Sequence, residues 1–316
     1  MFSKQWQSIR SVHALILIST CAIVLSTTAS SIATAQTSKT LTASLVRTTH
    51  TSRWSPPSPD PSGITYWPAR GTLIVIDGEV EEMPKLYKGV NVFEATTAGS
   101  LVRTHDTTRF TGEPVGIDIS VEPGSNRFYI ADDSKKRIFV VSLGADGKIG
   151  TADDTITSFS TAAFGNNDPE GLTFGTINGQ RRLFTVDGAG RRVYVQAPGS
   201  NGRFDGVGPE GDDRVTSFNL AVFNVGDPEG VEFNPATGRL YVIDRKKPRI
   251  FDLTTSGGLV GTVDLRKFNM VNPSDLALAP GSKNTAIRNL YITDRGVDNN
   301  VDPNENDGKI FEIKLN

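Results

Sequence analysis

Cysteine and long apolar runs are what this chain most lacks. It has one cysteine, Cys21, and three histidines among 316 residues. If Cys21 leaves with an N-terminal leader, the remaining chain has no disulfide, no thiol nucleophile and no cysteine metal site. The sequence also has no Gly-X-Ser-X-Gly elbow, zinc-type histidine motif or phosphate-binding P-loop. These absences disfavour a Ser–His hydrolase, so any hydrolysis would need a metal-activated water or a carboxylate base.

Charge imbalance is also small. The formal net charge is −2, and no long Lys/Arg run occurs. Without Lys4 and Arg10 the balance is 31 basic against 35 acidic residues, or −4. Such a surface does not suggest a nucleic-acid binder. We therefore expect a monomer that meets a small anionic ligand or a protein partner, with no nucleic acid and no membrane span.

The N-terminus has the pattern of a secretory signal. Lys4 and Arg10 precede an apolar stretch from Ala14 to Leu25, which is too short to span a bilayer. Ala33-Thr34-Ala35 then provides small residues for cleavage. We expect a signal peptide over 1–35 and a mature domain over 36–316 that is secreted or periplasmic. A lipoprotein would use Cys21, but Thr20 fits poorly before it and little apolar sequence precedes it.

Five copies of a short motif run through the remaining chain. Each has an acid or amide, then Pro, a variable residue, usually Gly, and an aliphatic residue. The copies are Asp60-Pro-Ser-Gly-Ile, Glu113-Pro-Val-Gly-Ile, Asp168-Pro-Glu-Gly-Leu, Asp227-Pro-Glu-Gly-Val and Asn272-Pro-Ser-Asp-Leu. A strand ending in Asp77, Asp132, Asp187, Asp244 or Asp294 follows each copy, and then a strand with an aliphatic–aromatic pair. Self-similarity at this period indicates a repeat architecture.

Each repeat predicts about four short strands, the unit of a propeller blade. The last repeat ends without a fourth strand, and Ser44–Thr48 matches the outer strand Ser100–Thr104 of the first repeat residue for residue. We therefore expect an all-β, five-bladed β-propeller of antiparallel blades, closed by the N-terminal strand. Six blades remain an alternative if the stretch from Asp187 to Asp227 hides a degenerate blade.

Two resemblances follow from these motifs. The segment Tyr241-Val-Ile-Asp-Arg to Arg-Ile-Phe-Asp252 resembles blades of the NHL and gluconolactonase-like propellers. The Asp-Pro-Glu-Gly starts are similar to the Glu-Gly blade starts of phytase-like and calcium-activated nucleotidase propellers. The resemblance covers essentially the whole mature chain. It implies the fold, whereas function is only weakly implied, because propellers host many activities.

The variable motif positions predict an all-oxygen site on the channel axis. Two unpaired glutamates crowd an axis only at a high energetic cost, which a hard cation removes, and Ca²⁺ accepts six to eight oxygens. The resemblance to the calcium-activated nucleotidases implies four ligands, Glu170, Glu229, Ser62 and Ser274, with Val115 departing from the pattern. The structural alternative is that both glutamates hydrogen-bond to the backbone of neighbouring blades.

The aspartates that end the second strands are expected to cap the turns that follow them. One or two of them are alternatively ligand-binding, together with nearby basic residues that would form a rim for an anionic ligand such as a phosphoester. These ligand-binding candidates are Asp132, Asp187, Asp244, Asp294, Lys136, Arg191, Arg245 and Arg295. The alternative for the basic residues is an ordinary solvated turn.

Three polar loops resemble peripheral calcium sites. The first contains Asp146, Asp153 and Asp154, the second runs from Asn201 to Asp213, and the third contains Asp302, Asn304 and Asn306. Each is alternatively a Gly-rich turn. The long loops 77–90 and 294–308 are expected to wall one side of a binding site on the acidic face. His50 and His105 are expected at the surface.

Two functions fit these features. The first is an exported, calcium-binding propeller that serves as a ligand- or protein-binding module. The second is a calcium-dependent hydrolase of phosphoester, nucleotide or lactone substrates that uses the channel face. An open pocket beside Glu170, Glu229 and basic residues would favour the hydrolase.

Overall fold

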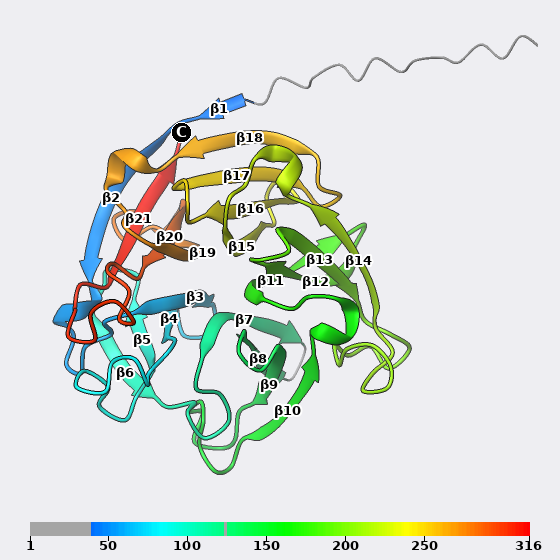
Figure 1. Ribbon diagram of the computed structural model, residues 1–316, viewed down its shortest axis with the longest axis horizontal. Helices are drawn as coiled ribbons and strands as arrows, with labels where there is room; N and C mark the ends of the chain where they lie inside the picture. Colours follow the sequence, from blue (N-terminus) through cyan, green and yellow to red (C-terminus); the bar gives the residue numbers. More distant parts are fainter. Residues whose placement is uncertain (1–38, 123–124) are drawn as a thin grey trace, which may run out of the picture. The chain divides into compact units, whose positions relative to one another are not determined.

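A computed structural model describes residues 39–122 and 125–316 of the chain, and these residues form a five-bladed β-propeller (Figure 1). Each blade is an antiparallel sheet whose strands follow chain order from the axis outward, except that the outer strand of the last blade comes from the N-terminus. The expected fold is therefore confirmed. The predicted signal peptide and its cleavage site lie outside the described residues.

The five blades divide the strands among them as follows. Blade 1 has β3 (Pro61–Trp67), β4 (Thr72–Asp77), β5 (Val92–Thr96) and β6 (Leu101–His105); blade 2 has β7 (Pro114–Glu122), β8 (Ser125–Asp132), β9 (Arg137–Ser142) and β10 (Thr155–Ser160). Blade 3 has β11 (Pro169–Ile177), β12 (Gln180–Asp187), β13 (Arg192–Ala197) and β14 (Arg214–Asn219). Blade 4 has β15 (Pro228–Asn234), β16 (Arg239–Asp244), β17 (Arg249–Thr254) and β18 (Leu259–Asp264). Blade 5 has β19 (Pro273–Pro280), β20 (Arg288–Asp294), β21 (Lys309–Leu315) and β2 (Ala43–His50).

The helical elements of the described chain are short 3-10 turns. They are η1 (Thr51–Arg53), η2 (Ala162–Phe164), η3 (Ala221–Phe223) and η4 (Arg266–Phe268). The last three lie between the outer strand of one blade and the inner strand of the next. In the described residues no helix is long and apolar enough to cross a membrane, in agreement with the sequence.

The second strand of each blade is buried on both faces, because neighbouring blades pack on either side of it. In β4 every residue is buried, and Leu73 to Ile76 are at most 1 % exposed. The run is therefore continuously apolar instead of alternating, as expected for a strand with two covered faces. The core is divided into clusters, several of which join residues of adjacent blades.

The N-terminal segment closes the ring, as the sequence predicts. In Figure 1, β2 lies beside β21, with Ala43 opposite Leu315 and His50 opposite Lys309. The sequence did not indicate a second contact, in which β1 (Lys39–Leu41) pairs in parallel with β18 of blade 4. The N-terminal segment thus joins blades 4 and 5 and covers two strand edges that would otherwise be open.

The six-blade alternative is wrong. The stretch from Asp187 to Asp227 contains β13 and β14, which belong to blade 3. Its extra length lies in the loop between these strands, residues 198–213, which returns the chain to the same sheet.

The inner strands approach so closely that the motif glycine is required. A Cβ on Gly171 would lie 2.6 Å from Gly230 Cα, and one on Gly116 would lie 2.7 Å from Glu170 O. Asp275 replaces glycine in blade 5, and its side chain occupies the axis next to Gly230. The channel is therefore obstructed at this level and has two separate ends.

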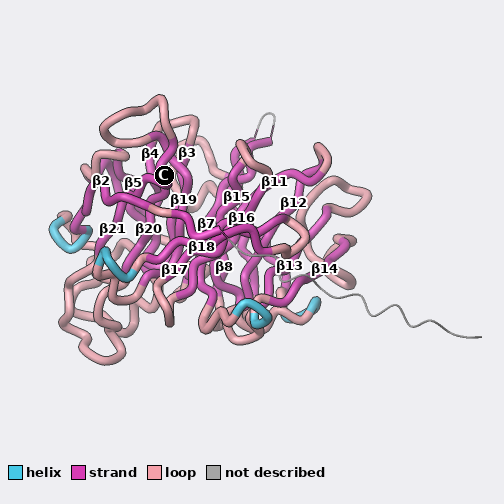
Figure 2. The backbone as a smooth tube through the Cα atoms, turned by 90° about the horizontal axis from the view of Figure 1, so that it is seen from above, coloured by secondary structure: helices cyan, strands magenta, loops and turns pink. Residues whose placement is uncertain are grey.

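We call one end the start face and the other the exit end. At the start face each motif Pro pairs with the aspartate that ends the second strand, for example Pro61 with Asp77 and Pro169 with Asp187. The exit end is formed by the carboxyl-terminal halves of the five inner strands. Figure 2 shows loops gathered at the two opposite edges of the strand layer.

Candidate functional site

Three positions of each repeat meet at the start face. The first is the opening motif residue: Asp60, Glu113, Asp168, Asp227 and Asn272. The second is the variable motif residue: Ser62, Val115, Glu170, Glu229 and Ser274. The third directly follows the strand-end aspartate: Gly78, Asp133, Gly188, Arg245 and Arg295. Because the five blades have the same register, the residues at these three positions determine the charge on each part of the start face. We call each such part a sector and name it by its blades.

Arginines neutralise the sector formed by blades 4, 5 and 1. Arg245 binds Asp227 Oδ2 through Nη2 at 2.8 Å and Glu229 Oε1 through Nε at 2.9 Å. Arg295 binds both oxygens of Asp60, at 2.7 and 2.8 Å, and also pairs with Glu79. Burial alone would lower the pKa of Arg295, but these carboxylates hold it well above its usual value.

The sector formed by blades 2 and 3 has acids without such cations. Carboxylate oxygens of Asp133, Asp168 and Glu170 lie within 4.8 Å of one another, and Glu113 is in a neighbouring trio with Asp132 and Asp133. Among the described residues, no Lys or Arg forms an ion pair with Glu113, Asp133, Asp168 or Glu170. Asp132 lies 3.6 Å from Lys135 Nζ, whereas these four acids have no compensating cation among the described residues.

Glu170 is the most isolated of these acids. In the described part of the chain, its carboxylate has no hydrogen-bond donor. Burial, and then repulsion from Glu229, Asp133 and Asp168, raises its pKa well above the usual value. Burial and the charge of Glu113 raise the pKa of Asp133 to about 7. Both groups are held close to other acids at a cost that a bound cation would remove.

The predicted central ligands lie at one face, but their contacts differ. Glu229 pairs with Arg245. Ser62 Oγ donates to Asp60 O at 3.1 Å, and Ser274 Oγ donates to Pro61 O at 2.9 Å, which links blades 5 and 1. Val115, which departs from the pattern, is buried in an apolar cluster between blades 2 and 3. The four-ligand calcium site stays a prediction.

Sequence reasoning misses Asp133 and Asp168 as partners of Glu170. From the sequence alone, Asp168 is only the opening residue of its motif, and Asp133 is only the neighbour of a strand-end acid. The repeat does distinguish them by position, because Asp133 occupies the place that Arg245 and Arg295 occupy in blades 4 and 5. Comparing signs of charge at that one position would reveal the uncompensated sector.

The strand-end aspartates are buried and hydrogen-bonded to the chain. Asp132 and Asp187 cap the following turn, as expected, by accepting the N–H groups of Lys135 and Gly190 at 2.7 Å each. Three others have different partners, namely Ser58 Oγ for Asp77 at 2.5 Å, Gly226 N for Asp244 at 2.9 Å and Asn272 N for Asp294 at 2.6 Å. These three partners lie in the segment that precedes the first strand of the blade. That segment passes the end of the second strand, where the aspartate lies.

The predicted basic rim is divided in two. Arg245 and Arg295 turn inward to the acids described above. Lys136 and Arg191 are exposed turn residues with φ values of 53° and 48°. These two fit the solvated-turn interpretation, since positive φ values are common in tight turns.

The peripheral loops are held by their own carboxylates. Asp154 accepts three N–H groups, from Gly144, Gly150 and Thr151, at 2.7–3.1 Å. Thr151 Oγ1 is a hydrogen-bond donor within reach of Asp146 Oδ1 at 3.2 Å and Asp153 Oδ1 at 2.8 Å. In blade 3, Asp205, Asp212 and Asp213 bring oxygens within 4.8 Å.

The predicted ligands of the third loop form hydrogen bonds with one another and with neighbouring segments. Asp302 Oδ1 accepts Asn304 N at 3.0 Å, Asn304 Oδ1 accepts Lys85 Nζ at 2.8 Å, and Asn306 Nδ2 donates to Ser52 O at 3.2 Å. The Lys85–Asn304 contact brings loops 77–90 and 294–308 together at the start face. Glu79, Glu82 and Asp298 form an acidic trio there, and burial and Glu79 raise the pKa of Glu82 to about 7.

The expectation that His105 is a surface residue is wrong. Its side chain is buried, and its Nδ1 accepts Ile149 N at 3.1 Å from the blade 2 loop. Burial lowers its pKa to about 4, despite the nearby Glu94. His105 is thus a neutral structural residue. His50 is only partly exposed.

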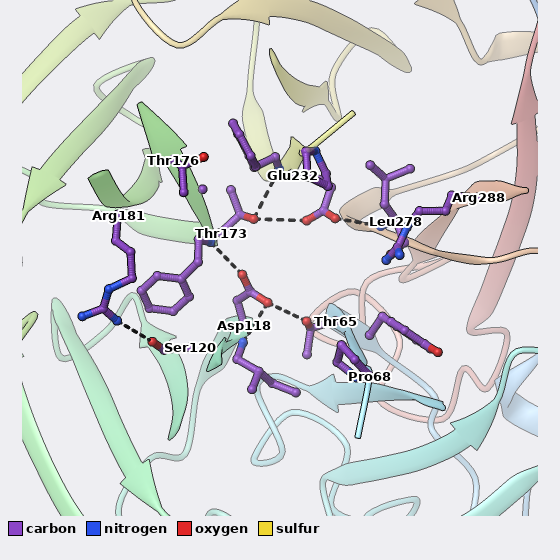
Figure 3. A pocket seen from close by; sticks show the side chains of 16 residues that line it. Thr65, Pro68, Asp118, Ser120, Thr173, Thr176, Arg181, Glu232, Leu278 and Arg288 are labelled. Carbon is purple, nitrogen blue, oxygen red and sulfur yellow. Dashed lines mark hydrogen bonds between the residues drawn. The ribbon is translucent and has the colours of Figure 1, made fainter. Parts of the chain in front are cut away.

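The exit end contains a feature that the sequence interpretation did not include. A pocket of about 370 Å³ lies there, lined by residues from all five inner strands (Figure 3). Asp118 and Glu232 lie in it, each one residue after the aliphatic position of its motif. An acid directly after the aliphatic motif residue, in the middle of the inner strand, was the available signal.

Several solved structures are similar to this chain at low sequence identity. The chain resembles regucalcin from Agrobacterium tumefaciens, a calcium-binding protein (12% identity, 85% of this chain and 95% of that one, TM-score 0.47). It also resembles virginiamycin B lyase from Staphylococcus aureus (13%, 87% and 100%, TM-score 0.44) and a luciferin-regenerating enzyme (15%, 81% and 91%, TM-score 0.44). These likenesses carry no argument about activity. A sequence model of one family matches residues 56–292, well over half of the chain, so this protein belongs to the SdiA-regulated family.

Proposed function

We propose that this protein is a calcium-dependent binding module whose ion is held at the start face by Asp133, Asp168 and Glu170. The observation that carries the proposal is the uncompensated acidic sector of blades 2 and 3. Blades 4 and 5 have arginines at the register position where blade 2 has Asp133 and blade 3 has Gly188. A divalent cation would supply the charge that arginines supply elsewhere in the ring.

The oxygen atoms present fit a hard cation. Asp133 Oδ1 accepts Ser134 N at 2.7 Å and Asp168 Oδ2 accepts Ala189 N at 2.8 Å, which fixes both carboxylates and leaves one oxygen of each free of these bonds. Glu170 contributes two oxygens. Calcium takes six to eight oxygens and tolerates irregular geometry, so water or a ligand oxygen would complete the shell. An anionic group of a ligand is the natural occupant of such open positions.

The test is thermal unfolding in EDTA and in added Ca²⁺, with Glu170→Gln and the predicted axial partner Glu229→Gln as separate variants. A ligand specific for the native state raises its apparent stability, by about 2.7 kcal/mol at a hundredfold excess over Kd. We expect a calcium shift that Glu170→Gln abolishes and Glu229→Gln largely retains, because Glu229 is already paired with Arg245. A shift retained in Glu170→Gln would place calcium elsewhere, and no shift in the unmodified protein would remove calcium from the proposal.

A second candidate is a calcium-dependent hydrolase. It is favoured by one observation, which is that burial raises the pKa of Glu229 to about 8 although Arg245 opposes the shift. A carboxyl group whose pKa lies near neutral pH is suited to general acid catalysis. Calcium-stimulated turnover of a phosphoester or lactone that Glu229→Gln abolishes would support this candidate over a pure binding module.

Export is part of the proposal. Its support is the arrangement of Lys4, Arg10, the Ala14–Leu25 stretch and Ala33-Thr34-Ala35. N-terminal sequencing of the protein recovered from periplasm or medium should give Gln36 as the first residue. An uncleaved chain found only in the cytoplasm would contradict export.

A further inference from the structure

The pocket at the exit end is separate from the start face. Asp275 and the crowded glycines lie between the two ends of the channel. Its walls are largely apolar and include Phe174, Phe233 and Leu278, and its volume of about 370 Å³ is in the range of small-molecule sites. Figure 3 shows Asp118 and Glu232 reaching inward between these walls.

The two carboxylates are fixed by neighbouring blades. Asp118 Oδ1 accepts Thr65 Oγ1 of blade 1 and Ile119 N, and its Oδ2 accepts Phe174 N of blade 3, each at 2.7 Å. Glu232 Oε1 accepts Leu278 N of blade 5 at 2.9 Å, and its Oε2 accepts Thr173 Oγ1 of blade 3 at 3.1 Å. The positions of both groups are therefore set before any ligand arrives.

These contacts leave some lone pairs of the two carboxylates unused, and these lone pairs are available to a ligand in the pocket. A carboxylate has about four lone-pair positions. Asp118 uses three and Glu232 uses two, and both side chains keep some accessible surface as lining residues of the pocket. A group with several N–H donors and a positive charge would fill the remaining positions.

The basic residues of the pocket are already engaged. Arg288 donates to Leu278 O at 2.8 Å, and its guanidinium lies 5.6 Å from the ring centre of Tyr66. Arg181 donates to Ser120 Oγ at 3.3 Å and to Gly202 O at 3.0 Å. The donors to the two inner carboxylates described above are hydroxyl and backbone N–H groups, and all of these are neutral.

We infer that this pocket binds a small molecule that carries a protonated amine or guanidinium group on an apolar body. The charged group would lie between Asp118 and Glu232, and the apolar body would pack against Phe174 and Phe233. This ligand site is independent of the calcium site at the start face.

Proton release accompanies this binding. Burial, and then the charge of Asp118, raises the pKa of Glu232 to about 8, although hydrogen bonds from Leu278 N and Thr173 and the charge of Arg288 oppose the shift. A cation placed beside it stabilises the charged form and lowers that pKa. Binding at pH 7 is therefore expected to release protons, and the measured enthalpy is expected to depend on the buffer.

The test uses three probes that share one phenyl ring and differ in charge: phenethylamine, phenylalanine and 3-phenylpropionate. Calorimetry in EDTA at pH 7 removes the start-face ion from the measurement. We expect phenethylamine to bind with proton release and 3-phenylpropionate to bind at least tenfold more weakly. Phenylalanine binding as well as the amine would extend the class to zwitterions. Equal binding of the amine and the propionate, or no binding of the amine, would overturn the inference.

Two variants locate the binding. Glu232→Gln keeps the size of the side chain and an acceptor for Leu278 N, and we expect it to weaken phenethylamine at least tenfold and to remove the proton release. Thr176 is exposed at the pocket, so Thr176→Trp blocks the pocket without disturbing the buried acids, with Thr176→Ala as its control. Unchanged binding in Thr176→Trp would place the amine elsewhere, even if Glu232→Gln fails to fold.

Discussion

At the scale of single residues, the charge of the start face depends on one register position. Arg245 and Arg295 follow the strand-end aspartates of blades 4 and 5, whereas Gly188 follows that of blade 3. A Cβ on Gly188 would lie 2.8 Å from Asp168 Oδ2 and 3.2 Å from Glu170 Oε1. The glycine therefore lies directly against two of the acids that have no cationic partner among the described residues.

Gly188→Arg should replace the proposed cation with a side chain. The guanidinium would stand beside Asp168 and Glu170 as Arg245 stands beside Asp227 and Glu229. We expect higher thermal stability in EDTA and loss of the calcium shift, both read from unfolding curves. Gly188→Ala is the matched control and should gain no stability in EDTA. If Gly188→Arg keeps the full calcium shift, the ion is not at this position.

The raised carboxyl pKa values also predict a pH dependence. Glu229 and Glu232 have pKa values of about 8 in the folded protein, above the ordinary value of 4.5. The folded state therefore binds more protons than the unfolded state between these values, and its stability must fall as the pH rises. In EDTA, the melting temperature should decrease from pH 5 to pH 8. Glu232→Gln should flatten this decrease, and a melting temperature that rises over the range would contradict the assignment.

At the scale of elements, the long loops between the third and fourth strands of blades 2 and 3 are each organised by one carboxylate. Asp154 accepts three N–H groups in blade 2, and Asp213 accepts those of Gly199, Asp205 and Gly206 in blade 3. The loop of blade 2 also contacts His105 of blade 1 through Ile149 N. These loops thus contribute to packing between blades.

Asp154→Asn should destabilise the protein by roughly 1–3 kcal/mol, because the amide cannot accept all three N–H bonds. Asp146→Asn, at an exposed position of the same loop, should cost less than about 0.5 kcal/mol. Denaturant unfolding in EDTA measures both without calcium. Equal stability of the two variants in EDTA would contradict the structural role of Asp154, and a difference seen only with calcium would indicate a bound ion.

At the scale of the whole molecule, ring closure depends on the N-terminal segment. β2 pairs with β21 over its length, and β1 adds to β18 of the preceding blade. Hydrogen bonds accepted by the axial acids also connect the blades, since Asp118 bridges blades 1 and 3, Glu232 bridges blades 3 and 5, and Asp275 Oδ2 accepts Ile64 N of blade 1 at 3.0 Å. The ring is therefore joined both at its periphery and at its axis.

Deleting residues 36–50 should lower the melting temperature by well over 10 °C and cause association, because β21 would become an open edge. Deleting residues 36–41 removes only β1 and should cost a few degrees. Thermal unfolding and size-exclusion chromatography report the two effects. A full deletion that remains monomeric and melts within a few degrees of the parent would show that the axis alone holds the ring.

The sequence by itself determined the propeller fold, the start face and the closing strand, and it favoured five blades over six. These follow from local signals, since Pro, Gly and Asp fix turns, and alternating or continuous apolar runs fix strands at a constant period. Ser44–Thr48 could be assigned to the last blade only because its copy, Ser100–Thr104, lies in a complete repeat.

Only the tertiary structure decided which charges compensate one another. Arg295 could be placed at the start face from its register, but not its pairing with Asp60, which lies 235 residues away. Likewise, His105 is buried by a loop of the next blade, and Asp118 and Glu232 meet at the exit end through contacts with neighbouring blades. Such pairings depend on side-chain reach across blade boundaries, and a repeat pattern fixes the position of each backbone but not the direction in which its side chain turns.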